Sequence, residues 1–79
     1  MDPENIKNMI EQGLQGSIAN VVGDGRHFEA VIVCEAFAGK TMVEQHQMVY
    51  QALGANMDEA IHALSMRTFT PEQYARQQS

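Results

Sequence analysis

The first segment of the chain carries apolar residues at helical spacing. Asp2 followed by Pro3 is a favourable N-cap and first-turn pair for a helix. The apolar positions that then line one helical face are Ile6, Met9, Ile10 and Leu14. We therefore expect a helix over residues 3–14, with Gly13 and Gly16 bracketing its end.

Two strand-like segments follow, with a glycine-rich turn between them. Residues 18–22 are rich in β-branched side chains, and the Gly-Asp-Gly sequence at residues 23–25 is a strong turn signal. Residues 27–36 alternate less cleanly, because Val31 and Val33 lie on the face opposite to the other apolar residues. This pattern is typical of a central strand that is covered on both sides. We expect the two segments to form a β-hairpin.

A second helix, a third strand and a short final helix complete the pattern. Thr41 can cap a helix that ends near Gly54. One stripe of this helix consists of Met42, His46, Val49, Tyr50 and Leu53. Residues 61–69 predict a strand that joins the hairpin after crossing over by way of the helix. The Thr-Pro-Glu-Gln sequence at residues 70–73 opens the final helix, and the polar tail from about residue 76 is expected to fray.

These elements predict one domain over residues 1–79, of the α/β (α+β) class, in the order α-β-β-α-β-α. A third strand that returns by way of a helix makes a three-stranded mixed sheet, with the helices packed on it. A chain of 79 residues, 44% of them hydrophobic, has room for one folded domain of this kind.

The cysteine content and the apolar segments indicate the cellular setting. Cys34 is the sole cysteine, so we expect neither an intramolecular disulfide nor a thiolate metal cluster within one copy, and a cytoplasmic location is the default. Inside a strand, Cys34 should act as a small buried hydrophobe. His46, on the apolar stripe of the second helix, should be buried with one hydrogen bond. The polar N-terminus and the strand-length apolar stretches predict no signal peptide and no membrane span.

The charge balance disfavours nucleic-acid binding. Five basic residues against ten acidic ones give a formal net charge of −5, which opposes the counterion-release binding that attaches proteins to DNA or RNA. The basic residues also form no run; they are Lys7, Arg26, Lys40, Arg67 and Arg76. Only the fold could gather them into one surface.

Three central segments together resemble the body of a BolA protein. They are residues 28–36 (FEAVIVCEA), 37–53 (FAGKTMVEQHQMVYQAL) and 61–71 (IHALSMRTFTP). The turn at residues 23–28 (GDGRHF) resembles the short, IbaG-like branch of this family. The resemblance implies a fold similar to the class II KH domain. The sequence has no Gly-x-x-Gly between helical segments, the loop with which KH modules clamp nucleic acid, so RNA binding does not follow from the fold.

The resemblance also implies a metal-cluster role for His62. BolA proteins use the histidine at this position as a ligand of a [2Fe-2S] cluster that they share with a monothiol glutaredoxin and its glutathione, and the isolated chain is expected to hold no cofactor. The second family ligand is a cysteine or histidine in the hairpin loop, where Asp24 stands here. A carboxylate is a poorer ligand for such a cluster than an imidazole, so His27 is the expected substitute, with a surface role as its alternative.

The function implied is that of an adaptor and not of an enzyme, serving iron-sulfur cluster maturation or trafficking, or iron and stress sensing. The alternative is a DNA-binding transcriptional regulator of stress response or cell morphology, as some BolA proteins are described. A partner or nucleic-acid surface would draw on Asp24, Arg26, Lys40 and Arg67. Against the alternative, residues 41–53 contain no Arg or Lys to meet phosphates. Whether the free protein forms a homodimer is left open.

Overall fold

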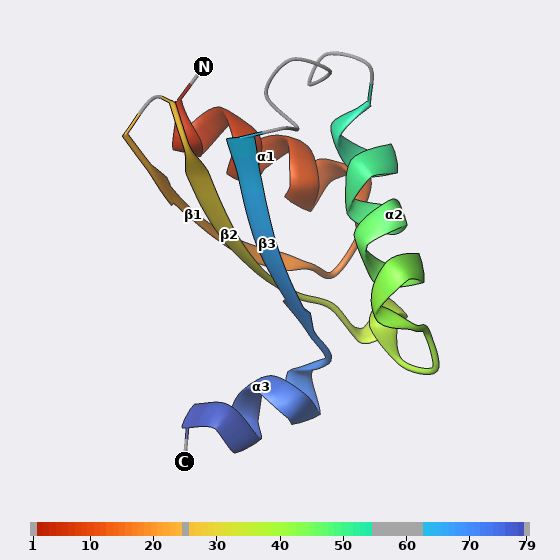
Figure 1. Cartoon of the computed structure of the whole chain (residues 1–79). Coiled ribbons are helices and arrows are strands. Elements are labelled where there is room, and N and C mark those ends of the chain that lie inside the picture. Colours follow the sequence, from red (N-terminus) through yellow and green to blue (C-terminus); the bar gives the residue numbers. More distant parts are fainter. Residues whose placement is uncertain (1, 25, 55–62, 79) are drawn as a thin grey trace.

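The computed structural model describes residues 2–24, 26–54 and 63–78. Its elements in chain order are α1 (Pro3–Gly13), β1 (Ile18–Gly23), β2 (Phe28–Val33), the short 3-10 helix η1 (Glu35–Phe37), α2 (Met42–Leu53), β3 (Leu64–Phe69) and α3 (Pro71–Gln78). The predicted order of helices and strands is confirmed (Figure 1). The predicted second strand is shorter than expected, because it ends at Val33 and η1 follows.

The three strands form one mixed sheet with β2 in the centre. Strands β1 and β2 are antiparallel, with Ile18 opposite Val33, as expected of the hairpin. Strands β2 and β3 are parallel, with Phe28 opposite Leu64 and Val33 opposite Phe69. The predicted mixed sheet is therefore confirmed, and β1 and β3 are its two edges.

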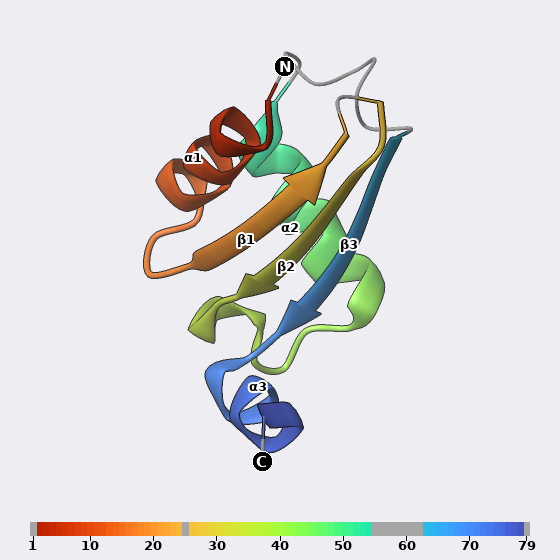
Figure 2. The same cartoon turned by 90° about the vertical axis from the view of Figure 1, so that its left-hand side faces the viewer.

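Helices α1 and α2 both lie on one face of this sheet, and Figure 2 views the strands from the other face. The β2 residues that point toward the helices are buried: Phe28, Ala30 and Ile32. On the opposite face Val31 and Val33 are half-buried and Glu29 is exposed. The prediction of a strand covered on both sides is wrong for the described residues, because both of these helices pack on the same side.

The core lies between the sheet and these two helices. Its buried apolar residues are Ile6, Ile10, Ala19, Phe28, Ala30, Ile32, Cys34, Phe37, Val49, Leu53 and Leu64. The predicted burial of Cys34 is confirmed, and its Sγ donates to the carbonyl oxygen of Gln15 at 3.8 Å. Helices α1 and α2 pack closely at Gly13, where a Cβ would stand 2.6 Å from that of Ala52.

The buried face of α2 differs from the predicted stripe. Met42 is 71% exposed, whereas Gln45, which the stripe omits, is buried. The Nε2 of Gln45 donates to the carbonyl oxygens of Phe37 (3.1 Å) and Lys40 (3.0 Å), and its Oε1 accepts from the hydroxyl of Thr68 at 2.6 Å. These bonds satisfy the amide, so a polar residue can occupy the core side of the helix.

His46, one residue further along α2, is half-buried, and its imidazole has no hydrogen-bond partner among the residues that the structure describes. The prediction of a buried, hydrogen-bonded His46 is therefore wrong. The physical reason is that Gln45, with a longer side chain and three available partners, occupies the inward position and turns His46 toward the edge of the helix. There it lines a shallow hollow together with Met66 and Phe69 of β3.

The helix starts agree with the predicted caps. The Thr41 hydroxyl accepts from the N–H of Glu44 at 3.1 Å, while the Glu44 carboxylate accepts from the N–H of Thr41 at 2.8 Å. Thr70 and Gln73 form the same reciprocal pair at the start of α3, at 3.0 and 3.2 Å. Such capping boxes satisfy two backbone donors that the first helical turn leaves unpaired. Where the sequence predicts fraying from about residue 76, α3 continues to Gln78.

No helix among the described residues has the length and apolar character needed to cross a membrane.

Candidate functional site

The loop between β1 and β2 folds around the side chain of Asp24. The Oδ1 of Asp24 accepts hydrogen bonds from the backbone N–H groups of Arg26 and His27, both at 2.9 Å. The backbone N–H of Asp24 donates in turn to the carbonyl oxygen of His27 at 3.2 Å. An aspartate that bonds to the backbone two and three residues on is typical of tight turns. The turn fixes the backbone of His27 at the entry to β2.

The same hydrogen bonds set the charge state of Asp24. The backbone N–H of His27, and then that of Arg26, hold the pKa of this carboxyl below its ordinary value, because both stabilise the carboxylate form. The exposed Asp24 is therefore an anion at neutral pH whose Oδ1 already has two donors. A metal ion at Oδ1 would compete with the backbone N–H groups of Arg26 and His27 that hold the turn.

Gly23 is the other residue on which the turn depends. A Cβ at this position would stand 2.5 Å from the carbonyl oxygen of His27 and 2.5 Å from the ring of Phe28. Because both neighbours are fixed by the loop and the core, only glycine lets the end of β1 approach His27 so closely.

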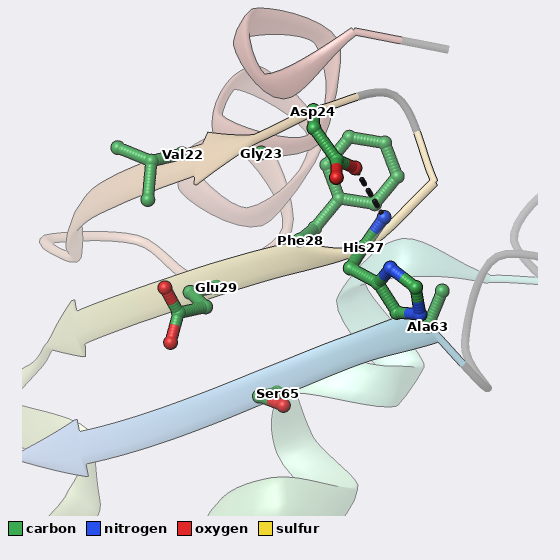
Figure 3. Close-up of a pocket in the computed structure, with 8 residues that line it drawn as sticks. All are labelled: Val22, Gly23, Asp24, His27, Phe28, Glu29, Ala63 and Ser65. Atoms are coloured by element: carbon green, nitrogen blue, oxygen red, sulfur yellow. Dashed lines mark hydrogen bonds between the residues drawn. The ribbon is translucent and has the colours of Figure 1, made fainter.

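A pocket of about 380 Å³ lies beside this turn, where β1 ends and β2 and β3 begin (Figure 3). It is lined by Val22, Gly23, Asp24, His27, Phe28, Glu29, Ala63 and Ser65. The imidazole of His27 extends toward Ala63, next to the first residue of β3. The carboxylate of Asp24 points toward the backbone nitrogen of His27, with which it forms a hydrogen bond.

His62, the ligand that the resemblance implies, lies outside the described residues. It directly precedes Ala63, the residue toward which His27 points. The parallel pairing of β2 with β3, which sets Phe28 opposite Leu64, brings Ala63 beside the hairpin loop. The structure thus joins His27, Asp24 and the entry to β3 around one pocket.

The donor set of this pocket fits one side of a shared cluster better than a complete metal site. An imidazole nitrogen, as His27 offers, can replace a thiolate on one iron of a [2Fe-2S] centre. The carboxylates of Asp24 and Glu29 are harder donors that suit other cations. No group of three or more His, Cys, Asp or Glu side chains able to hold a metal occurs in the parts of the chain described here. Among the described residues, the lining of this pocket therefore offers one imidazole and not a complete metal site.

The basic residues proposed for a partner or nucleic-acid surface are not gathered in one place. Arg26 lies in the loop that precedes β2, whereas Lys40 lies between η1 and α2, beyond the other end of β2. Arg67 is on β3, on the sheet face away from α1 and α2, with its guanidinium 5.5 Å from the centroid of the Phe69 ring. The fold therefore does not build a basic patch from these three residues.

Val22, Glu29 and Ser65 line the pocket, although sequence reasoning did not single them out. Each stands on a different strand, and they form one row across the sheet because Val22 is opposite Glu29 and Glu29 is opposite Ser65. The hairpin register is deducible from the turn, but the register of β3 is not. Ser65 could therefore be found only in the folded molecule.

Known proteins resemble this chain in sequence. The BolA-like protein family matches residues 7–73. The acid stress protein IbaG of Escherichia coli is 35% identical over 77 residues, which cover 96% of this chain and 92% of that protein. The DNA-binding transcriptional regulator BolA of Haemophilus influenzae is 40% identical over 55 residues, covering 70% of this chain and 53% of that protein.

A solved structure agrees in fold. The bolA protein homologue from Coxiella burnetii superposes with a TM-score of 0.87 at 47% identity, and the match covers 96% of this chain and 99% of that one. Agreement of sequence and fold over almost the full length confirms the resemblance found in the three central segments. The chain belongs to the BolA-like protein family.

Proposed function

We propose that this protein is an IbaG-like adaptor that binds a monothiol glutaredoxin and shares a [2Fe-2S] cluster with it in the cytoplasm. Its role would be iron-sulfur cluster maturation or trafficking, or iron and stress sensing, without catalysis of its own. The observation that carries the proposal is the position of His27, whose imidazole lines the pocket and extends toward Ala63, the residue that His62 directly precedes in the sequence.

The hydrogen bonds of the loop support His27 over Asp24 as the ligand from this side. Asp24 uses its Oδ1 to hold the turn, and its carboxylate is a hard donor. His27 supplies its backbone to the turn and leaves its ring directed into the pocket. When bound, a [2Fe-2S] cluster would supply transferable iron and sulfide, while this chain would supply imidazole ligands that protonation can release.

The test is to combine the full chain with a monothiol glutaredoxin, glutathione, iron and sulfide, and to record visible absorption and circular dichroism. We expect a heterodimer whose spectra differ from those of the cluster-bound glutaredoxin homodimer. Spectra identical to the homodimer, with no co-elution of the two proteins, would contradict the proposal.

Histidine variants assign the ligands within that experiment. His62→Ala should change the cluster spectrum strongly, and His46→Ala, on α2 away from the pocket, serves as the matched control. His27→Ala decides the second ligand: a changed spectrum assigns it to His27, and an unchanged one removes His27 from the cluster.

A second candidate function is DNA binding, favoured by the relative in Haemophilus influenzae that is a DNA-binding transcriptional regulator. The separation of Arg26 from Lys40 at opposite ends of β2, and the absence of Arg and Lys from α2, offer little to phosphates. A salt titration of binding to duplex DNA separates the two functions. Tight, sequence-selective binding would favour the regulator, and negligible affinity even at low ionic strength would remove it.

A further inference from the structure

The sheet face opposite α1 and α2 is apolar at several positions and is not covered by either helix (Figure 2). We call it the open face. Ile18 is 62% exposed and Val22 is 61% exposed, although both are large apolar residues on strands. An apolar patch of this kind on a small domain commonly marks an interaction surface.

The side chains of the open face form three rows across β1, β2 and β3. In that strand order, the rows are Ile18, Val33 and Phe69; Asn20, Val31 and Arg67; and Val22, Glu29 and Ser65. Val31 stands at the centre. The two charged residues adjoin it in different directions, Glu29 two residues along the same strand and Arg67 on the neighbouring strand.

Neither charge has an ion-pair partner within the described chain. The two ion pairs found there join Lys7 to Glu11 and Glu72 to Arg76. Arg67 is instead held over the ring of Phe69, 5.5 Å from its centroid, which keeps the guanidinium on the open face. The face therefore presents one fixed cation and one anion around an apolar centre.

This arrangement is complementary to itself under one particular two-fold rotation. Two sheets that stack face to face are related by an axis lying between them. An axis along the strands through Val31 sets Glu29 against its own copy, and an axis across the strands sets Arg67 against its own copy. One diagonal axis leaves both charges unpaired. The other sets Arg67 of each copy against Glu29 of the other.

The diagonal axis that pairs Arg67 with Glu29 also brings apolar residues of the two copies into contact. It sets Val22 of each copy against Phe69 of the other, and Val31 and Ile18 against their own counterparts. The strands of the two sheets then cross at nearly a right angle, which is one of the two usual ways in which sheets pack. Charge and apolar character thus select the same arrangement.

We infer that the open face binds a second copy of this chain, as a two-fold dimer with reciprocal Arg67–Glu29 contacts. The three six-residue strands span about 14 Å by about 20 Å, from the usual strand spacing and rise. This footprint is smaller than the roughly 800 Å² per partner of a stable complex. The dimer is therefore weak and depends on protein concentration.

The dimer has a consequence for the pocket that carries His27. Val22, Glu29 and Ser65 belong both to the open face and to the lining of that pocket. A second copy on the open face would cover the pocket rim, so the homodimer must separate before a partner engages His27. This consequence rests on the proposed function. The dimer itself does not, and its test contains no glutaredoxin.

The first test is the molar mass of the free protein by sedimentation equilibrium. We expect the mass to rise from monomer toward dimer between about 10 µM and 1 mM, the range of weak association. Over the same range, amide NMR signals of Val22, Val31 and Ser65 should shift while those of α1 do not. A monomer at every concentration, or shifts confined to the helices, would overturn the inference.

The decisive test is a charge exchange between two chains. R67E sets two acids together in the dimer and E29R sets two guanidinium groups together, so each variant alone should stay monomeric. An equal mixture restores both opposite-charge contacts and should dimerise again. A folding defect cannot be repaired by mixing, so recovery in the mixture supports the contact and its absence overturns it.

K40E provides a matched control, because it changes the net charge as much as R67E does but lies outside the open face. It should dimerise like the unmodified protein. If K40E abolished dimerisation as fully as R67E, the effect would be due to net charge. This result would overturn the inference that the open face is the dimer interface.

Discussion

The two faces of the sheet use similar residues for opposite purposes. Ile32 points toward α1 and α2 and is fully buried, whereas its neighbours Val31 and Val33 point the other way and are half-buried. On the covered face, apolar contacts and the hydrogen bonds of Gln45 hold the domain together. The open face contributes less to the core. It carries the charged residues Glu29 and Arg67, and it borders the pocket beside His27. The stability of the fold therefore depends chiefly on the covered face, whereas the contacts that we propose with a second copy lie on the open face of the same strands.

The largest expected difference is between residues of β2 that point to opposite faces. Ile32→Ala should lower the free energy of unfolding by about 2–5 kcal/mol, because it leaves a cavity under both helices. Val31→Ala should cost clearly less, because its side chain is half-buried. Urea denaturation of both variants measures the contrast, and equal losses would mean that the open face is part of the core.

The next largest effect concerns Gln45, the buried polar residue of α2 that packs against the covered face of the sheet. Gln45→Ala should lower the free energy of unfolding by about 1–3 kcal/mol, since it leaves the buried carbonyl of Phe37 without this donor and the Thr68 hydroxyl without its acceptor. Gln47→Ala, at an exposed position of the same helix, should change it by less than about 0.5 kcal/mol. A loss no larger than the control would show that Gln45 does not anchor α2.

At the edge of the covered face, Glu11 joins α1 to β1 and makes stability depend on pH. Its Oε2 accepts from the backbone N–H of Ala19 (3.0 Å) and from the ammonium of Lys7 (2.7 Å), and these bonds hold the pKa of Glu11 below its ordinary value of 4.5. Because the folded-state pKa is the lower one, the stabilisation is complete above 4.5 and is lost as the pH falls through the folded-state value.

Acid denaturation of Glu11→Gln checks this dependence. The variant should be less stable than the unmodified protein at neutral pH. The difference should shrink as the pH falls below 4.5, because protonation of Glu11 then removes the carboxylate's contribution from the unmodified protein as well. Glu4→Gln, an exposed change on the same helix, is the control. A difference that stayed constant down to acid pH would exclude the carboxylate as its cause.

The smallest effect on stability is expected in the loop between β1 and β2. Asp24→Ala removes the acceptor of the Arg26 and His27 amides, so hydrogen exchange at these two amides should accelerate while the core amides stay protected. Asp24→Asn retains a side-chain oxygen and should preserve more of the protection. Unchanged exchange in both variants would show that the turn does not depend on this side chain.

Local patterns predicted what local physics controls. The caps at Thr41 and Thr70 follow from hydrogen bonds within four residues, and both formed as expected. The buried face of α2 was less predictable. Gln45 reads as a surface residue until the carbonyls of Phe37 and Lys40 and the hydroxyl of Thr68, on β3, are brought around it.

In the candidate site, too, local patterns predicted the residues, and only tertiary contacts decided their roles. His27 and Asp24 were identified from the turn and the family pattern, yet the sequence did not indicate which of them caps the loop and which faces the pocket. That choice depends on the close approach of Gly23 to His27 and on the parallel register of β3, which are contacts between different strands.

The sequence by itself determined the family, the order of the elements, the helix caps and the mixed sheet, because each depends on residue preferences and short spacings. Only the tertiary structure decided that α1 and α2 cover a single face, that Gln45 replaces His46 in the core, and that Glu29 and Arg67 stand beside Val31 on the open face. Those outcomes depend on packing between distant segments, where one register or one helix rotation changes which side chains meet.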